Sequence, residues 1–155
     1  MKLLRLVALP LLLAFAGCGK TPPPAPVAKH EHHAPHGGTP VVLGNEAYHL
    51  ELVLDPAASK LQAFILDGEM ENFIRVAAPS FEILATTGGK SQPLLLVAVA
   101  NSATGETLGD TALFETTAPW LKTTPSFDGV LTKLEIRGTT FAGVPFNFPR
   151  GNDKD

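Results

Sequence analysis

The chain has 155 residues, of which 45% are hydrophobic, twelve are basic and fifteen are acidic. Lys2 and Arg5 lie within the apolar first 17 residues, so the remainder carries ten basic residues against fifteen acidic ones. This acidic balance, without a basic cluster, argues against a nucleic-acid partner. The chain has one cysteine, which excludes an intramolecular disulfide. The length after residue 17 suits one domain with its own core.

The N-terminal segment has the features of an export signal. Two basic residues precede an apolar run that is shorter than the roughly 20 residues of a membrane-spanning helix. The run ends in Leu13-Ala14-Phe15-Ala16-Gly17-Cys18. This ending resembles the lipobox of bacterial lipoproteins, in which a peptidase cuts before the cysteine and lipid is attached to it. The resemblance implies a signal peptide over residues 1–17 and lipidation of Cys18.

The residues that follow predict a tethered protein. Residues 18–29 contain the proline-rich run Thr21-Pro22-Pro23-Pro24-Ala25-Pro26, which favours an extended linker behind the lipidated cysteine. In lipoproteins of two-membrane bacteria, Gly19 after the cysteine implies sorting to the outer membrane. The resemblance therefore predicts a protein on the inner leaflet of the outer membrane, facing the periplasm, with the membrane as its partner through Cys18.

Residues 39–150 predict an all-β domain, and residues 151–155 a polar tail. Short runs with period-two alternation are separated by turn residues, and no segment has a convincing amphipathic helical period. Strands are expected at residues 48–54, 61–66, 73–77, 80–86, 94–100, 111–117, 130–137 and 143–148. About seven or eight short antiparallel strands favour a β-sandwich, Ig-like or cupredoxin-like, with a small barrel as the alternative.

Two strands carry further expectations. Leu94 to Val99 is apolar on both faces, which predicts a central strand covered on both sides. His49 and Glu51 alternate with the leucines of their strand, so both should point away from the leucine face, towards solvent or a neighbouring segment.

The histidines are the strongest functional signal. All five lie between residues 30 and 49. Imidazole is a common ligand for zinc, copper and nickel. The histidine-rich segment, residues 30–38, contains His30, His32, His33 and His36. If Gly37-Gly38 folds this segment back over the strand, His36, His49 and Glu51 form three arms of a metal site, and one of His30, His32 and His33 completes the four ligands usual for zinc.

Two alternatives to this metal site stay open. A short histidine-rich tract also fits a solvated tail that binds metals weakly, and His49 with Glu51 also fits a strand with a polar surface face. A blue-copper centre is excluded because it needs a cysteine ligand, and Cys18 is expected to be acylated.

The run Pro35-His36-Gly37-Gly38, followed by Leu43-Gly44 and His49-Leu50-Glu51, resembles segments of small bacterial periplasmic proteins, some of them associated with metal handling or efflux. This resemblance implies metal contact at His36 and His49.

The sequence therefore predicts a lipid-anchored periplasmic protein that binds zinc or copper for buffering, delivery or sensing, with an envelope partner such as a metal transporter. No catalytic motif is recognised, so an enzyme is not expected. The alternative function is an envelope protein-interaction module in which the histidines are incidental.

Overall fold

A computed structural model describes residues 32–153 of the chain. Eight strands follow one another: β1 (Thr39–Leu43), β2 (Tyr48–Asp55), β3 (Lys60–Asp67), β4 (Ser80–Thr87), β5 (Lys90–Ala98), β6 (Leu113–Thr117), β7 (Phe127–Ile136) and β8 (Thr139–Phe148). A short 3-10 helix, η1 (Pro119–Lys122), lies between β6 and β7. Within the described residues, no helix has the length and apolar character needed to cross a membrane.

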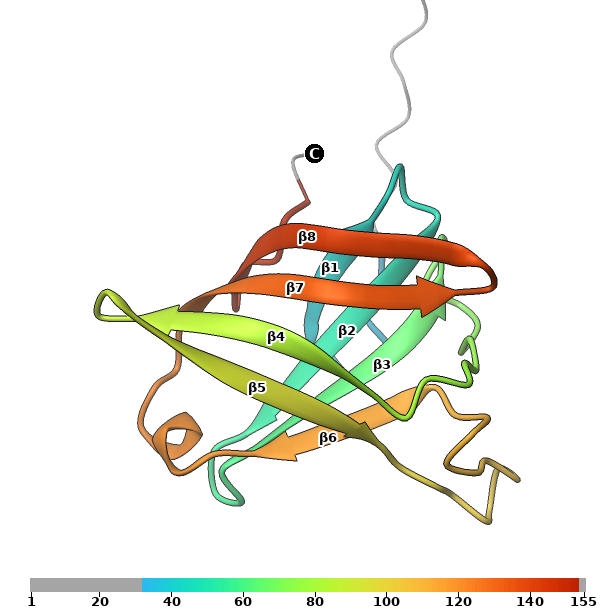
Figure 1. Ribbon diagram of the computed structural model, residues 1–155, viewed down its shortest axis with the longest axis horizontal. Coiled ribbons are helices and arrows are strands. Elements are labelled where there is room, and N and C mark those ends of the chain that lie inside the picture. Colours follow the sequence, from blue (N-terminus) through green and yellow to red (C-terminus); the bar gives the residue numbers. More distant parts are fainter. Residues whose placement is uncertain (1–31, 154–155) are drawn as a thin grey trace, which may run out of the picture.

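The strands form one antiparallel sheet in the order β1-β2-β3-β6-β5-β4-β7-β8. In Figure 1, β7, β8, β4 and β5 cross in front of β1, β2 and β3, so the sheet curls into a nearly closed barrel. The prediction of an all-β antiparallel domain is confirmed. The finer prediction of a two-sheet sandwich is not confirmed, because all eight strands belong to a single sheet.

The barrel is closed at its β1–β8 seam by side chains. Val42 in β1 donates its backbone N–H to Asn152 Oδ1 (2.7 Å), and Asn152 Nδ2 donates to the Val42 carbonyl (3.1 Å). Thr39 Oγ1 donates to the Pro149 carbonyl (3.1 Å). The amide of Asn152 thus takes the place of a strand neighbour for Val42, and it satisfies two edge groups that would otherwise lack a partner.

The core lies inside the barrel and follows the alternation in the sequence. Leu50 and Leu52 of β2 are fully buried, as are Leu61 and Ile65 of β3. The alternating positions of β2, His49 and Glu51, therefore lie on the outer face, as predicted. Both are nevertheless 0% exposed. A neighbouring segment, and not solvent, covers this part of the outer face.

Some local predictions need correction. Residues 73–77 form no strand, because only Phe73 and Val76 make isolated bridges, and β1 was not among the expected strands. The strand at residues 94–99 is not covered on both sides, since Leu95 is 53% and Val97 50% exposed. Hydrophobic run length cannot distinguish a doubly covered strand from one with an exposed apolar face.

Candidate functional site

The N-terminal segment of the described chain, His32 to Gly38, covers the outer face of β2. Gly37 adopts a left-handed conformation (φ 67°), and Gly37 N–H donates to the Ala34 carbonyl (3.0 Å), which closes a tight turn. A Cβ on Gly38 would lie 2.7 Å from the Leu52 carbonyl oxygen and 2.8 Å from Glu51 Cγ. The Gly37-Gly38 pair therefore folds residues 32–38 back over the strand, which is the condition that the metal-site hypothesis set.

Glu51 is the anchor of this segment. Its Oε1 accepts the backbone N–H groups of His36 (2.7 Å) and Gly38 (2.9 Å), and its Oε2 lies 2.8 Å from His36 Nδ1. Two backbone N–H groups and an imidazole thus converge on one fully buried carboxylate. Such charge-assisted hydrogen bonds are about twice as strong as neutral ones, and they hold the segment in a fixed position.

His36 is further positioned by aromatic rings. Its imidazole stacks on Phe64 with a centroid distance of 4.0 Å and an interplanar angle of 17°, and Phe73 lies 5.7 Å away. Phe64 is the cross-strand neighbour of Glu51, so β3 supplies the platform next to the carboxylate. A carboxylate accepts only, so Nδ1 carries the proton and Nε2 faces outward from this contact.

His49 lies two residues before Glu51 on the same face, with different surroundings. Its cross-strand neighbours are Val42 in β1 and Leu66 in β3, both apolar. Its Nδ1 lies 3.2 Å from the Asp67 carbonyl oxygen, which can only accept. Nδ1 therefore bears the proton of the neutral ring. Burial lowers the pKa of His49, and the nearby His32 lowers it further, so the ring is neutral at pH 7.

His32 contacts His49 from the N-terminal segment. The two ring centroids are 4.7 Å apart and the ring planes are tilted by 46°. The Nε2 atoms of both rings are buried and have no hydrogen-bond partner among residues 32–153. Buried polar atoms nearly always have partners, so an adjacent pair without them is the least satisfied place in the described fold.

The structure separates the predicted ligands into two pairs. His36 joins Glu51 and His32 joins His49, so the three predicted arms do not converge on one point. Within the described part of the chain, no group of three or more His, Cys, Asp or Glu side chains is placed to hold a metal ion. His33 is exposed. His30 and Cys18, the other two predicted functional residues, lie outside the described residues.

Sequence reasoning missed the aromatic platform under His36. Phe64 alternates onto the outer face of β3, which its strand pattern could have indicated, but Phe73 comes from the irregular segment after β3. Comparisons with family models, curated proteins and solved structures find no match for this chain.

Proposed function

We propose that this chain is a lipid-anchored, periplasm-facing protein that binds a divalent transition metal, zinc or copper, through His49 and His32. The observation that carries the proposal is the pair of buried Nε2 atoms without hydrogen-bond partners among the described residues. Leaving such a group unpaired costs about 1–3 kcal/mol. A metal ion between the two rings would give both nitrogens a partner, and imidazole nitrogen suits zinc and copper.

The two ligands come from different parts of the chain, which favours a metal site built by the fold over weak binding along a histidine tract. His49 lies on β2 and His32 on the segment folded over it. Four ligands are usual for zinc, and His30 is a further candidate from the same tract. In this proposal His36 and Glu51 support the site, because their mutual hydrogen bond fixes the segment that carries His32.

The protonation state of His49 fits a ligand. With Nδ1–H held by the Asp67 carbonyl, Nε2 presents its lone pair. Burial lowers the pKa of His49 from the usual 6.5, so the ring remains an available ligand somewhat below neutral pH. Acidification past that pKa would protonate Nε2 and release the metal.

The predicted lipid anchor at Cys18 would keep this binding at the inner leaflet of the outer membrane. Buffering, sensing, or delivery to an envelope partner such as a metal transporter are the roles that fit. The proposed site needs β2 and the N-terminal segment folded over it, and it does not require the Ig-like or cupredoxin-like sandwich expected from the sequence.

Calorimetric titration of residues 19–155, without an affinity tag, with Zn(II) and Cu(II) at pH 7 tests the proposal. We expect stoichiometric binding with a Kd below about 1 µM, weakened at least about tenfold by His32→Ala. His49→Gln should have the same effect, and circular dichroism checks its fold. His33→Ala is the matched control, because His33 comes from the same tract but is exposed. Equal affinity in all three variants would remove the site.

A second function, an envelope interaction module, is favoured by a different observation. Leu95 and Val97 of β5 and Leu84 of β4 are large apolar side chains that are 53%, 50% and 37% exposed. They share the outer face of two paired strands, and such patches often mark protein contacts. Under this reading Leu95→Ser abolishes the cellular role while His32→Ala leaves it intact. The metal reading predicts the reverse.

A further inference from the structure

A pocket of about 460 Å³ lies beside the N-terminal segment, and its lining includes His36 but neither His32 nor His49. The segment after β3 and the segment before β6 form its walls together with β3 itself. The lining includes His36, Phe64, Phe73, Arg75, Asn101 and Glu106. A volume of this size is typical of small-molecule sites, which combine an apolar lining with a few polar groups.

One wall of the pocket is aromatic and held in place. Phe64 and Phe73 lie 5.9 Å apart, and His36 contacts both while Glu51 fixes its Nδ1. Phe73 is 49% exposed, which is unusual for a phenylalanine within a cluster of rings. A flat apolar group entering the pocket would cover this ring face and gain the packing that aromatic pairs favour.

The opposite wall offers hydrogen-bond donors. Arg75 Nη2 donates to the Thr104 carbonyl (2.5 Å), and Nη1 lies 3.3 Å from Asp110 Oδ2. These contacts orient the guanidinium but use only two of its five N–H groups. Asn101 Oδ1 accepts the Ala103 N–H (3.1 Å), while its Nδ2 makes no hydrogen bond to another residue of the described range. The orientation of both donor groups is therefore set in advance.

Glu106 is the acidic residue of the lining, and both of its carboxylate oxygens already accept hydrogen bonds. Its Oε1 accepts the Ala112 N–H (2.8 Å) and its Oε2 accepts the Thr104 hydroxyl (2.5 Å). Burial raises the pKa of Glu106, but hydrogen bonds and the positive charge of the nearby Arg75 outweigh that effect and lower the pKa overall. An ionised carboxylate with both oxygens occupied has little capacity left for a ligand cation. Donors remain the polar groups that a ligand can use.

We propose that this pocket binds a small molecule that joins a planar apolar group to a carboxylate. The planar group would pack on Phe73 and Phe64, and the carboxylate would accept hydrogen bonds from Arg75 and Asn101. Guanidinium is suited to this because its N–H groups match the spacing of two carboxylate oxygens. The site uses neither His49 nor His32, so it does not depend on the proposed metal function.

The test uses benzoate as the probe and benzamide as its uncharged isostere, with residues 19–155, which hold the whole described fold. Two-dimensional ¹H–¹⁵N NMR titration should locate benzoate at the pocket with a Kd below about 1 mM. Benzamide should bind at least about tenfold more weakly. Equal affinity for the two probes, or shifts that lie elsewhere on the molecule, would overturn the proposal.

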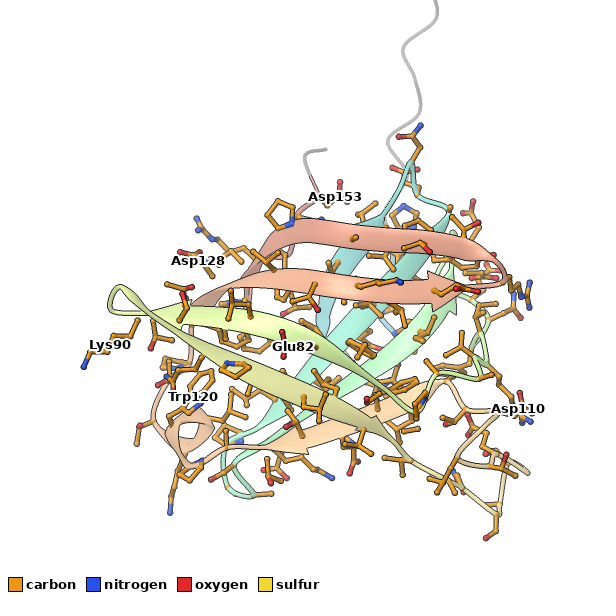
Figure 2. The ribbon with its side chains drawn as sticks, in the orientation of Figure 1. Glu82, Lys90, Asp110, Trp120, Asp128 and Asp153 are labelled. Carbon is orange, nitrogen blue, oxygen red and sulfur yellow. The ribbon has the colours of Figure 1, made fainter. Side chains whose placement is uncertain are left out.

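Matched variants test each wall separately. Arg75→Gln should weaken benzoate binding at least about tenfold. Lys90→Gln should not, because it removes a positive charge at the opposite end of the molecule from Asp110, the neighbour of Arg75 (Figure 2). Phe73→Ala should weaken both probes, and Leu95→Ala, which trims an equally exposed apolar side chain on β5, should weaken neither. Unchanged benzoate binding in Arg75→Gln and in Phe73→Ala would refute the assignment. The NMR spectra themselves report whether each variant is folded.

Discussion

The imidazoles of His36 and His49 lie over the same face of β2, yet they differ in burial and in hydrogen-bond partner. His36 lies over the strand with its Nδ1 on the Glu51 carboxylate, and its side chain is 39% exposed. His49 is fully buried with its Nδ1 on a backbone carbonyl, and its Nε2 has no partner among the described residues. The comparison teaches that membership of a histidine cluster does not define a ligand. Both rings use Nδ1 for a hydrogen bond, so what distinguishes them is burial, because the His36 side chain is partly exposed while Nε2 of His49 is buried.

Removing the Glu51 carboxylate, which holds His36 but not His49, should have the largest effect on stability. Glu51→Ala leaves the partly buried N–H groups of His36 and Gly38 without this acceptor and opens a void under the segment. We expect the free energy of unfolding to fall by about 3 kcal/mol. Urea denaturation at pH 7 measures it.

Glu82→Ala is the matched control for that experiment. Glu82 lies half-buried on the outer face of β4 opposite Lys133, and its carboxylate holds no backbone N–H group of the described residues. The expected loss is below about 0.5 kcal/mol. If the two variants lost the same stability, the carboxylate would not be the anchor of the segment.

A methyl group at Gly38 should have an intermediate effect. The Cβ of Gly38→Ala would lie 2.7 Å from a backbone oxygen and 2.8 Å from Glu51 Cγ, so the segment must move away from β2. We expect a loss of about 2 kcal/mol in the free energy of unfolding. Gly109→Ala, where the added Cβ meets no atom within 4 Å, should change stability little under the same denaturation assay. Similar losses for both would show that the close approach is not what requires glycine at 38.

Acidification should have the smallest effect on stability, and it tests the burial of the His49 ring. The pKa of His49 is lowered by burial and by His32, so below pH 6.5 the unfolded chain binds a proton that the folded chain excludes. The free energy of unfolding in metal-free buffer should therefore fall as the pH drops from about 7 through 6.5 and below. Denaturation midpoints measured across this range report the slope.

His49→Gln tests the source of that slope. Glutamine does not titrate, so this variant should lose less stability than the parent chain over the same interval. The hydrogen bond to the Asp67 carbonyl acts on His49 in the opposite direction to burial, as do the charges of Glu46 and Asp153, since all three raise its pKa. An identical slope in the variant would assign the pH dependence to other groups.

The strands were largely predictable because alternation reports which side chains enter the core. Leu50 and Leu52 of β2 are an example, since their period of two places them inside the barrel whatever the sheet order. The strand order, the single curled sheet and the exposed face at Leu95 were not predictable. They depend on which strands pair across long stretches of chain, and β3 pairs with β6 over a separation that local pattern does not encode.

Only part of the candidate site was predictable, because local pattern does not encode contacts between distant residues. The Gly37-Gly38 turn and the outward direction of His49 and Glu51 follow from local chemistry. The partners of each ring do not, because Phe64, Phe73 and the Asp67 carbonyl reach the histidines only through the pairing of β2 with β3 and the path of the chain after β3.

The sequence by itself determined the all-β class, the outer-face position of His49 and Glu51, and the capacity of Gly37-Gly38 to form a tight turn. These follow from backbone geometry and side-chain alternation, which act over a few residues. Only the tertiary structure decided that Glu51 holds His36 while His49 meets His32. That outcome depends on which donors and acceptors the pairing of β2 with β3 and the path of residues 32–38 bring within hydrogen-bond distance.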